Sequence, residues 1–109
     1  MVSYFVQYRG TSPDPRGFRD YYETRHAGIL REFANIRSLI LHRPAEWVDP
    51  FPVQRAETLL LAQMVFDSTQ DLNGALKSDA RRRARNDFRL FPEFTGEITH
   101  QAMSGKVIF

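Results

Sequence analysis

The chain has 109 residues, 42% hydrophobic and 26% charged, so we expect one globular domain spanning residues 1–109. It contains no cysteine, which excludes disulfides, thiolate metal sites, iron–sulfur clusters and cysteine nucleophiles. No apolar run approaches the roughly 18 to 20 residues that cross a bilayer, and the N-terminus lacks the pattern of a signal peptide. We therefore expect a cytoplasmic protein with no membrane partner.

The first half of the chain predicts a strand, a helix and a second strand. Residues 3–9 are rich in aromatic and β-branched side chains, which is typical of a strand. Asp14 is a suitable N-cap with Pro15 at the first helical position, so we expect a helix from there to about Phe33. Residues 36–43 have the composition of a second strand, and a proline follows it.

The segment 44–57 contains three prolines and shows no periodicity, so it predicts a long loop. A loop of this length in a small domain is usually functional or mobile. Trp47 and Phe51 lie in it and are candidate substrate-binding residues. They form either a lid over an apolar ligand or anchors that hold the loop to the domain.

The second half predicts a strand, a broken helical region and a final strand. Residues 58–67 form the clearest strand pattern, and Ser68 with Asp71 resembles a capping box at the start of a helix. We expect a break near residue 77, because Ser78 can cap a second helix. Residues 94–103 alternate like the last strand.

The order of elements is therefore β-α-β-β-α-β, which predicts an α+β, ferredoxin-like fold with a four-stranded antiparallel sheet and helices on one face. The strand at 58–67 is apolar on both faces, and two helices can cover only one of them. A second copy of the chain, packed sheet against sheet, is the simplest cover, so we predict a homodimer. The apolar residues 107–109 also suggest a packed tail.

One stripe of the first predicted helix falls within an arc of roughly 80° and consists of Phe18, Tyr22, His26, Ile29 and Phe33. In one interpretation, His26 is a core histidine satisfied by a backbone carbonyl. In the other, Tyr22 and His26 line a small-molecule cavity between helix and sheet. A neutral imidazole there accepts a proton, and the phenol donates a hydrogen bond to a developing oxyanion.

Other side chains are candidates for the same pocket. Arg25 projects near the stripe and is a possible partner for a carboxylate or enolate, and Phe33 ends the stripe. His42, at the end of the second strand, either reaches the pocket or is a surface histidine, and His100 has the same alternative. The histidines show no HxxxH or HxH spacing, so we expect no metal site.

Residues 81–85 read RRRAR, which raises the possibility of phosphate contacts with a nucleic acid. The net charge is only +2, and no aromatic stacking platform lies beside these arginines. We therefore expect no nucleic-acid partner and interpret the set as a solvated helical face, consisting of Arg81, Arg82, Arg85 and Arg89. The chain also lacks a Gly-rich phosphate loop and a GxSxG nucleophile motif.

The segment FRDYYETRHAGIL (residues 18–30), with YFVQYRG before it and LILHRP after it, resembles the EthD family and its YY-x-x-x-H helix. VFDS and the stretch ALKSDARRRARNDF extend the similarity over nearly the whole chain, and Asp87 stands where the family often carries an acid. Gly28 departs from the proline often found two residues after the histidine. The resemblance implies a ferredoxin-like domain that pairs into a dimeric α/β barrel.

Related barrels include cofactor-independent oxygenases, lactone isomerases, polyketide cyclases and dehydratases, and heme-binding branches. The resemblance thus implies an enzyme without a tightly held metal or other cofactor, acting in the catabolism of a small, largely apolar organic compound. His26 would be the base and Tyr22 the hydrogen-bond donor, in isomerisation, dehydration or oxygenation. One alternative is a non-catalytic accessory or ligand-binding protein of an oxidative degradation pathway, and another is heme binding through a histidine.

Overall fold

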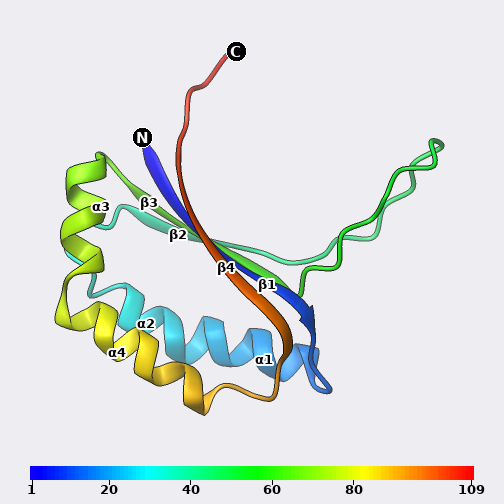
Figure 1. The fold of residues 1–109 in the computed structure, drawn as a ribbon, viewed down its shortest axis with the longest axis horizontal. Coiled ribbons are helices and arrows are strands. Elements are labelled where there is room, and N and C mark those ends of the chain that lie inside the picture. Colours follow the sequence, from blue (N-terminus) through cyan, green and yellow to red (C-terminus); the bar gives the residue numbers. More distant parts are fainter.

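Four segments of alternating burial form one antiparallel sheet in the computed structural model, which describes residues 1–109. The strands are β1 (Val2–Thr11), β2 (Ser38–His42), β3 (Leu60–Phe66) and β4 (Thr95–Ser104), in the spatial order β2-β3-β1-β4. All helices lie on one side of this sheet (Figure 1). The predicted α+β, ferredoxin-like fold with helices on one face is therefore confirmed.

The first helical region is not one regular helix. The Asp14 carboxylate accepts a hydrogen bond from the backbone N–H of Gly17 at 3.0 Å and caps α1 (Pro15–Tyr21). A π-helical turn, η1 (Tyr22–His26), follows, and α2 (Ala27–Leu30) ends the region. The helical region thus ends at Leu30, three residues before the predicted end near Phe33. It also contains a π turn that sequence periodicity does not predict, because periodicity assumes a constant 3.6 residues per turn.

The second helical region breaks where its capping residues predict. The Ser68 hydroxyl accepts a hydrogen bond from the N–H of Asp71 at 3.1 Å, and α3 (Thr69–Leu76) begins there. The Ser78 hydroxyl accepts one from the N–H of Arg81 at 3.2 Å and starts α4 (Asp79–Asp87). A 3₁₀ turn, η2 (Phe88–Leu90), carries the chain from α4 toward β4.

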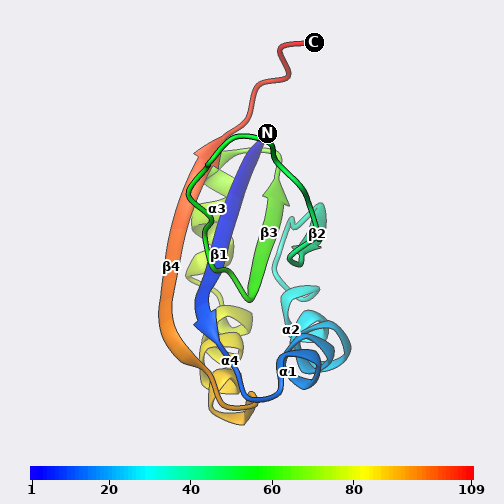
Figure 2. The same ribbon diagram turned by 90° about the vertical axis from the view of Figure 1, so that its right-hand side faces the viewer.

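The core lies between the sheet and the helices. Figure 2 shows the four strands side by side, with α3 and α4 behind them. On β3, alternate residues from Leu60 to Phe66 are buried against the helices. The ring of Phe18 is fully buried, and its centroid lies 5.3 Å from those of Tyr8 and Phe91 in edge-to-face geometry. This aromatic cluster fixes α1 and η1 against the sheet.

The opposite side of the sheet, which we call the open face, has no helix over it (Figure 1). It carries the residues that alternate with the buried ones, including Phe5, Ile40, Val65 and Met103. Ile40 is 42% exposed and Met103 is 51% exposed.

No helix in the structure has the length and apolar character required to span a membrane.

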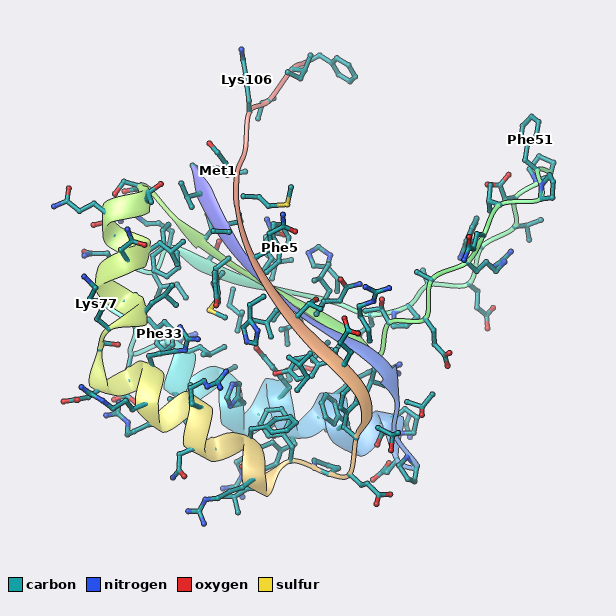
Figure 3. All side chains as sticks on the ribbon, viewed as in Figure 1. Met1, Phe5, Phe33, Phe51, Lys77 and Lys106 are labelled. Atoms are coloured by element: carbon teal, nitrogen blue, oxygen red, sulfur yellow. The ribbon has the colours of Figure 1, made fainter.

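Residues 44–57, which we call the arm, project from the sheet between β2 and β3 without regular secondary structure. Phe51 lies at the far end of the arm, well away from the domain, and is 74% exposed (Figure 3). The Cα radius of gyration is 15.0 Å, above the roughly 13 Å of a compact domain of this length. Residues 107–109 are also exposed, so the single chain does not pack its apolar tail.

Candidate functional site

A cavity of about 480 Å³ lies between the helices and the sheet. This volume is within the range of roughly 300 to 1,000 Å³ that is usual for small-molecule sites. Apolar and aromatic side chains of β1, β3, β4, α2 and α4 make most of its wall. Two histidines and two arginines also line it: His26, His100, Arg81 and Arg85.

The π turn η1 places Tyr22 and His26 on the cavity wall. Both are nearly inaccessible to solvent, and their ring centroids are 4.7 Å apart. The turn contains one residue more than an α-helical turn, so Leu30 takes the buried position that a regular helix would give to Ile29. Phe33 follows on the same wall. Single π turns of this kind are frequent at functional sites.

His26 is held by a carboxylate from the other helical region. Its Nδ1 lies 2.9 Å from Oδ2 of Asp87, and the Tyr21 hydroxyl donates a hydrogen bond to Oδ1 of Asp87, also at 2.9 Å. An ionised carboxylate only accepts, so neutral His26 carries its proton on Nδ1 and a lone pair on Nε2. No buried polar side-chain atom lacks a partner, and His26 makes no other hydrogen bond. Nε2 is therefore open to the cavity.

Burial sets the protonation states in the cavity. It lowers the pKa of His26 below its usual value, and the Asp87 carboxylate opposes this shift without cancelling it. Burial also raises the pKa of Tyr22 and of the adjacent Tyr8. At neutral pH the site thus combines a neutral imidazole with two protonated phenols.

This arrangement suits proton transfer to and from an apolar molecule. Nε2 of His26 can accept a proton, because Asp87 then stabilises the imidazolium that forms. A protonated phenol such as that of Tyr22 can donate a hydrogen bond to an oxygen that gains negative charge. The surrounding apolar wall strengthens both interactions by excluding water.

The structure brings three of the predicted site residues together in this cavity: Tyr22, His26 and Phe33. Arg25 is exposed and does not line the cavity. The prediction placed it near the buried stripe, but the wide turn of η1 leaves it on the solvent side of the helix.

Three other candidates lie on the opposite side of the sheet or beyond it. His42 projects from the open face, since it alternates with Leu41, and its Nε2 lies 3.0 Å from Oε1 of Gln63. His42 and Trp47 line a separate hollow of about 530 Å³ at the base of the arm. The Trp47 ring lies 4.1 Å from the Arg55 guanidinium, also on the arm. Phe51 is at the tip, so neither aromatic covers the cavity of His26.

The sequence interpretation missed Arg81 and Arg85, which it assigned to a solvated face. Each of them directly follows a buried alanine of α4, Ala80 or Ala84. This places each arginine about 100° around the helix from the buried stripe, at the edge of the cavity. In the sequence, the position of each arginine directly after a predicted buried alanine was the signal that could have placed it at the cavity edge. His100, for which the sequence left a pocket and a surface position open, lies on the β4 face that also carries Ile98, and it lines the cavity.

The family model of the EthD domain matches residues 11–91 of this chain. No curated protein matches it in sequence. Among the chain's His, Asp and Glu side chains, no group of three lies close enough together to hold a metal ion.

Solved structures share the fold over almost the whole chain. An EthD family protein from Bacillus halodurans has a TM-score of 0.73 at 18% identity, covering 97% of this chain and 99% of its own. A Streptomyces coelicolor monooxygenase, ActVA-Orf6, in complex with nanaomycin D has a TM-score of 0.70 at 13% identity, covering 99% and 89%. SnoaB, a cofactor-independent oxygenase from Streptomyces nogalater, has a TM-score of 0.65 at 11% identity, covering 97% and 93%.

Proposed function

Because the chain belongs to the EthD family, we propose that it is a cofactor-independent enzyme of small-molecule catabolism in which His26 is the general base. The observation that carries this proposal is the orientation of His26, whose Nδ1 is bonded to Asp87 while Nε2 is open to an apolar cavity. The cavity volume of about 480 Å³ suits a compact organic molecule.

In this proposal, Nε2 of His26 takes a proton from a carbon or oxygen of the substrate. The electron pair left behind moves onto a substrate oxygen, where the Tyr22 hydroxyl donates a hydrogen bond. Return of the proton to another carbon gives isomerisation. If a hydroxyl group on the neighbouring carbon leaves and takes up the proton from His26, the C–O bond breaks and the products are an alkene and water, which is dehydration. Addition of dioxygen to the carbanion forms a C–O bond, and the resulting peroxide takes up the proton from His26. Loss of water from this hydroperoxide leaves a carbonyl group, and oxygenation is the type of reaction named for SnoaB.

We also propose that two copies of the chain pair through their open faces. The exposed apolar residues of that face, such as Ile40 and Met103, have no cover in the single chain. Apolar patches of this kind commonly mark protein interfaces. The cavity of His26 lies on the other side of the sheet, so this pairing would not cover it.

The base can be tested without knowledge of the natural substrate. We suggest 2-tetralone, an apolar ring ketone whose C1 protons are acidic, incubated with the protein in D₂O and followed by NMR. We expect the protein to accelerate exchange of these protons for deuterium. His26→Gln should reduce this acceleration by roughly 10²- to 10⁴-fold, the usual contribution of a general base.

His42→Gln is the matched control, because His42 lies on the open face away from the cavity. It should exchange 2-tetralone as fast as the unaltered protein. An exchange rate of 2-tetralone that is unaffected by His26→Gln would refute the proposal that His26 is the general base. Binding of 2-tetralone without any accelerated exchange would favour the alternative of a non-catalytic ligand-binding protein.

A further inference from the structure

Four arginines of α4, at positions 81, 82, 83 and 85, fall into two pairs with different surroundings. Arg83 Nη2 lies 3.0 Å from Oε2 of Glu32, and Arg82 pairs with Asp79. Both of these pairs are at the surface. Arg81 and Arg85 form no ion pair with the protein, and both line the cavity. Two cations on one helix thus face the site without a counter-charge.

The surroundings of these two arginines offer them no anion. No acidic side chain lines the cavity. Asp87 stands behind His26, and its two oxygens are taken up by His26 and Tyr21. The Arg81 guanidinium lies 5.7 Å from the centroid of the Tyr4 ring, a contact that fixes the side chain without neutralising it.

The arginines are also the permanent positive charges of the site. Partial burial and the nearby charges of Arg81 and Arg85 lower the pKa of His100, and burial lowers that of His26. Both imidazoles therefore lose their charge more readily than free histidine, whereas a guanidinium stays charged throughout. The positive potential in the cavity consequently persists at neutral pH and above.

On this basis, and resting on the proposed function, we propose that the substrate is an organic anion with an apolar body and a carboxylate or enolate group, which Arg81 and Arg85 bind. Their i, i+4 spacing places them side by side on one face of α4. A guanidinium presents parallel N–H donors that match the two oxygens of a carboxylate. The largely apolar wall would hold the rest of the molecule near Nε2 of His26.

The test compares two probes with the same ring system and different charge, 2-naphthoate and 2-naphthamide. We expect the protein to bind 2-naphthoate at least tenfold more tightly, since a charge-assisted hydrogen bond contributes about one order of magnitude in affinity. NMR signals of the His26 and His100 rings report whether the probe enters the cavity. Arg81→Gln combined with Arg85→Gln should abolish the preference for the anion.

Arg82→Gln combined with Arg83→Gln is the matched control, since it removes the same charge from the outer face of the same helix. It should retain the tenfold preference. Arg85→Gln alone, at an exposed position, serves as the second variant if the double replacement at 81 and 85 impairs folding. Equal affinity for the two probes, unchanged histidine signals, or an equal loss in both double variants would overturn the proposal.

The outcome is separable from that of the proposed function. Equal binding of the two probes, together with His26-dependent exchange of 2-tetralone, would remove the anion site and leave the base. Selective binding of 2-naphthoate, together with exchange of 2-tetralone that is unchanged in His26→Gln, would refute the role of His26 as base and support the anion site.

Discussion

The two faces of the sheet differ in how completely a single chain supplies what they need. The face under the helices holds the buried aromatic cluster, the cavity and the His26–Asp87 pair, all within one chain. The open face carries exposed apolar residues such as Ile40, and the arm extends beside it without contacting the core (Figure 1). The first face has the components of a chemical site, and the second carries exposed apolar side chains of the kind that protein interfaces commonly use.

The alternation of each strand produces this difference. On β3, Leu60 and Met64 point toward the helices, whereas Leu61 and Val65 point away from them. Both sets are apolar, so the sequence of the strand alone does not distinguish the two faces. Only the placement of the helices decides which set closes a core, and three predictions follow from that placement.

The largest effect concerns the aromatic cluster under the helices. Phe18→Ala removes a fully buried ring from the contact between α1 and the sheet. We expect it to lower the free energy of unfolding by about 3 to 5 kcal/mol, measured by urea denaturation. Phe51→Ala, which truncates the same side chain on the exposed arm, should change the free energy by less than about 0.5 kcal/mol. Similar losses in both variants would contradict the division between the two regions.

A smaller effect is expected at Asp87, which acts through His26. In Asp87→Asn the side-chain amide can turn its NH₂ group toward Nδ1, which shifts the proton of His26 to Nε2 and removes the free lone pair. We expect exchange of 2-tetralone to slow by about 10- to 100-fold, less than the loss at His26 itself.

The pH profile separates this positioning role from a purely structural one. A base must be neutral, so activity is present above the pKa of His26 and is lost as the pH falls through it. Asp87 raises that pKa against the larger effect of burial, so Asp87→Asn should move the acid limb to lower pH. A slower reaction with an unchanged profile would show that Asp87 does not act through the imidazole.

The smallest effect on stability, with a clear effect on assembly, is expected on the open face. Ile40→Glu places a charge where we propose that two sheets meet, so we expect a dimer to become a monomer in light scattering. Its effect on the stability of the single chain should be within about 0.5 kcal/mol, because the position is 42% exposed. Leu90→Glu, on the helix side and 59% exposed, should leave the dimer intact. A monomeric unaltered protein would contradict the proposed pairing.

The sequence predicted those parts of the fold that depend on neighbouring residues. The strands, the caps at Asp14, Ser68 and Ser78, and the break between α3 and α4 all follow from local patterns. It also singled out Tyr22 and His26 as residues of one helical face, and the structure places both on the cavity wall.

The remaining features depend on contacts between distant parts of the chain. The π turn at Tyr22–His26 has no signature in helical periodicity, so the position of Leu30 was missed. The cavity-facing orientation of Arg81 depends on how α4 lies across the sheet. The arm extends away from the domain (Figure 3). Its prolines and aromatic residues predict a loop but not the direction in which the loop projects. Local patterns therefore predict the elements and the Tyr22–His26 pair, but not the two arginines of the cavity.

The π turn makes the cavity sensitive to residue number as well as to residue type. Deleting one residue from η1 would allow the segment to wind as an ordinary α-helix, and Leu30, then one position closer to Phe18, would keep the buried place that a regular helix gives to Ile29. The deletion would thus retain the packing of Phe18 and Leu30 while removing one residue from the turn that carries Tyr22 and His26. A gap at this place in a relative's alignment would thus identify a protein that keeps the architecture and builds this part of the cavity wall on a regular helix.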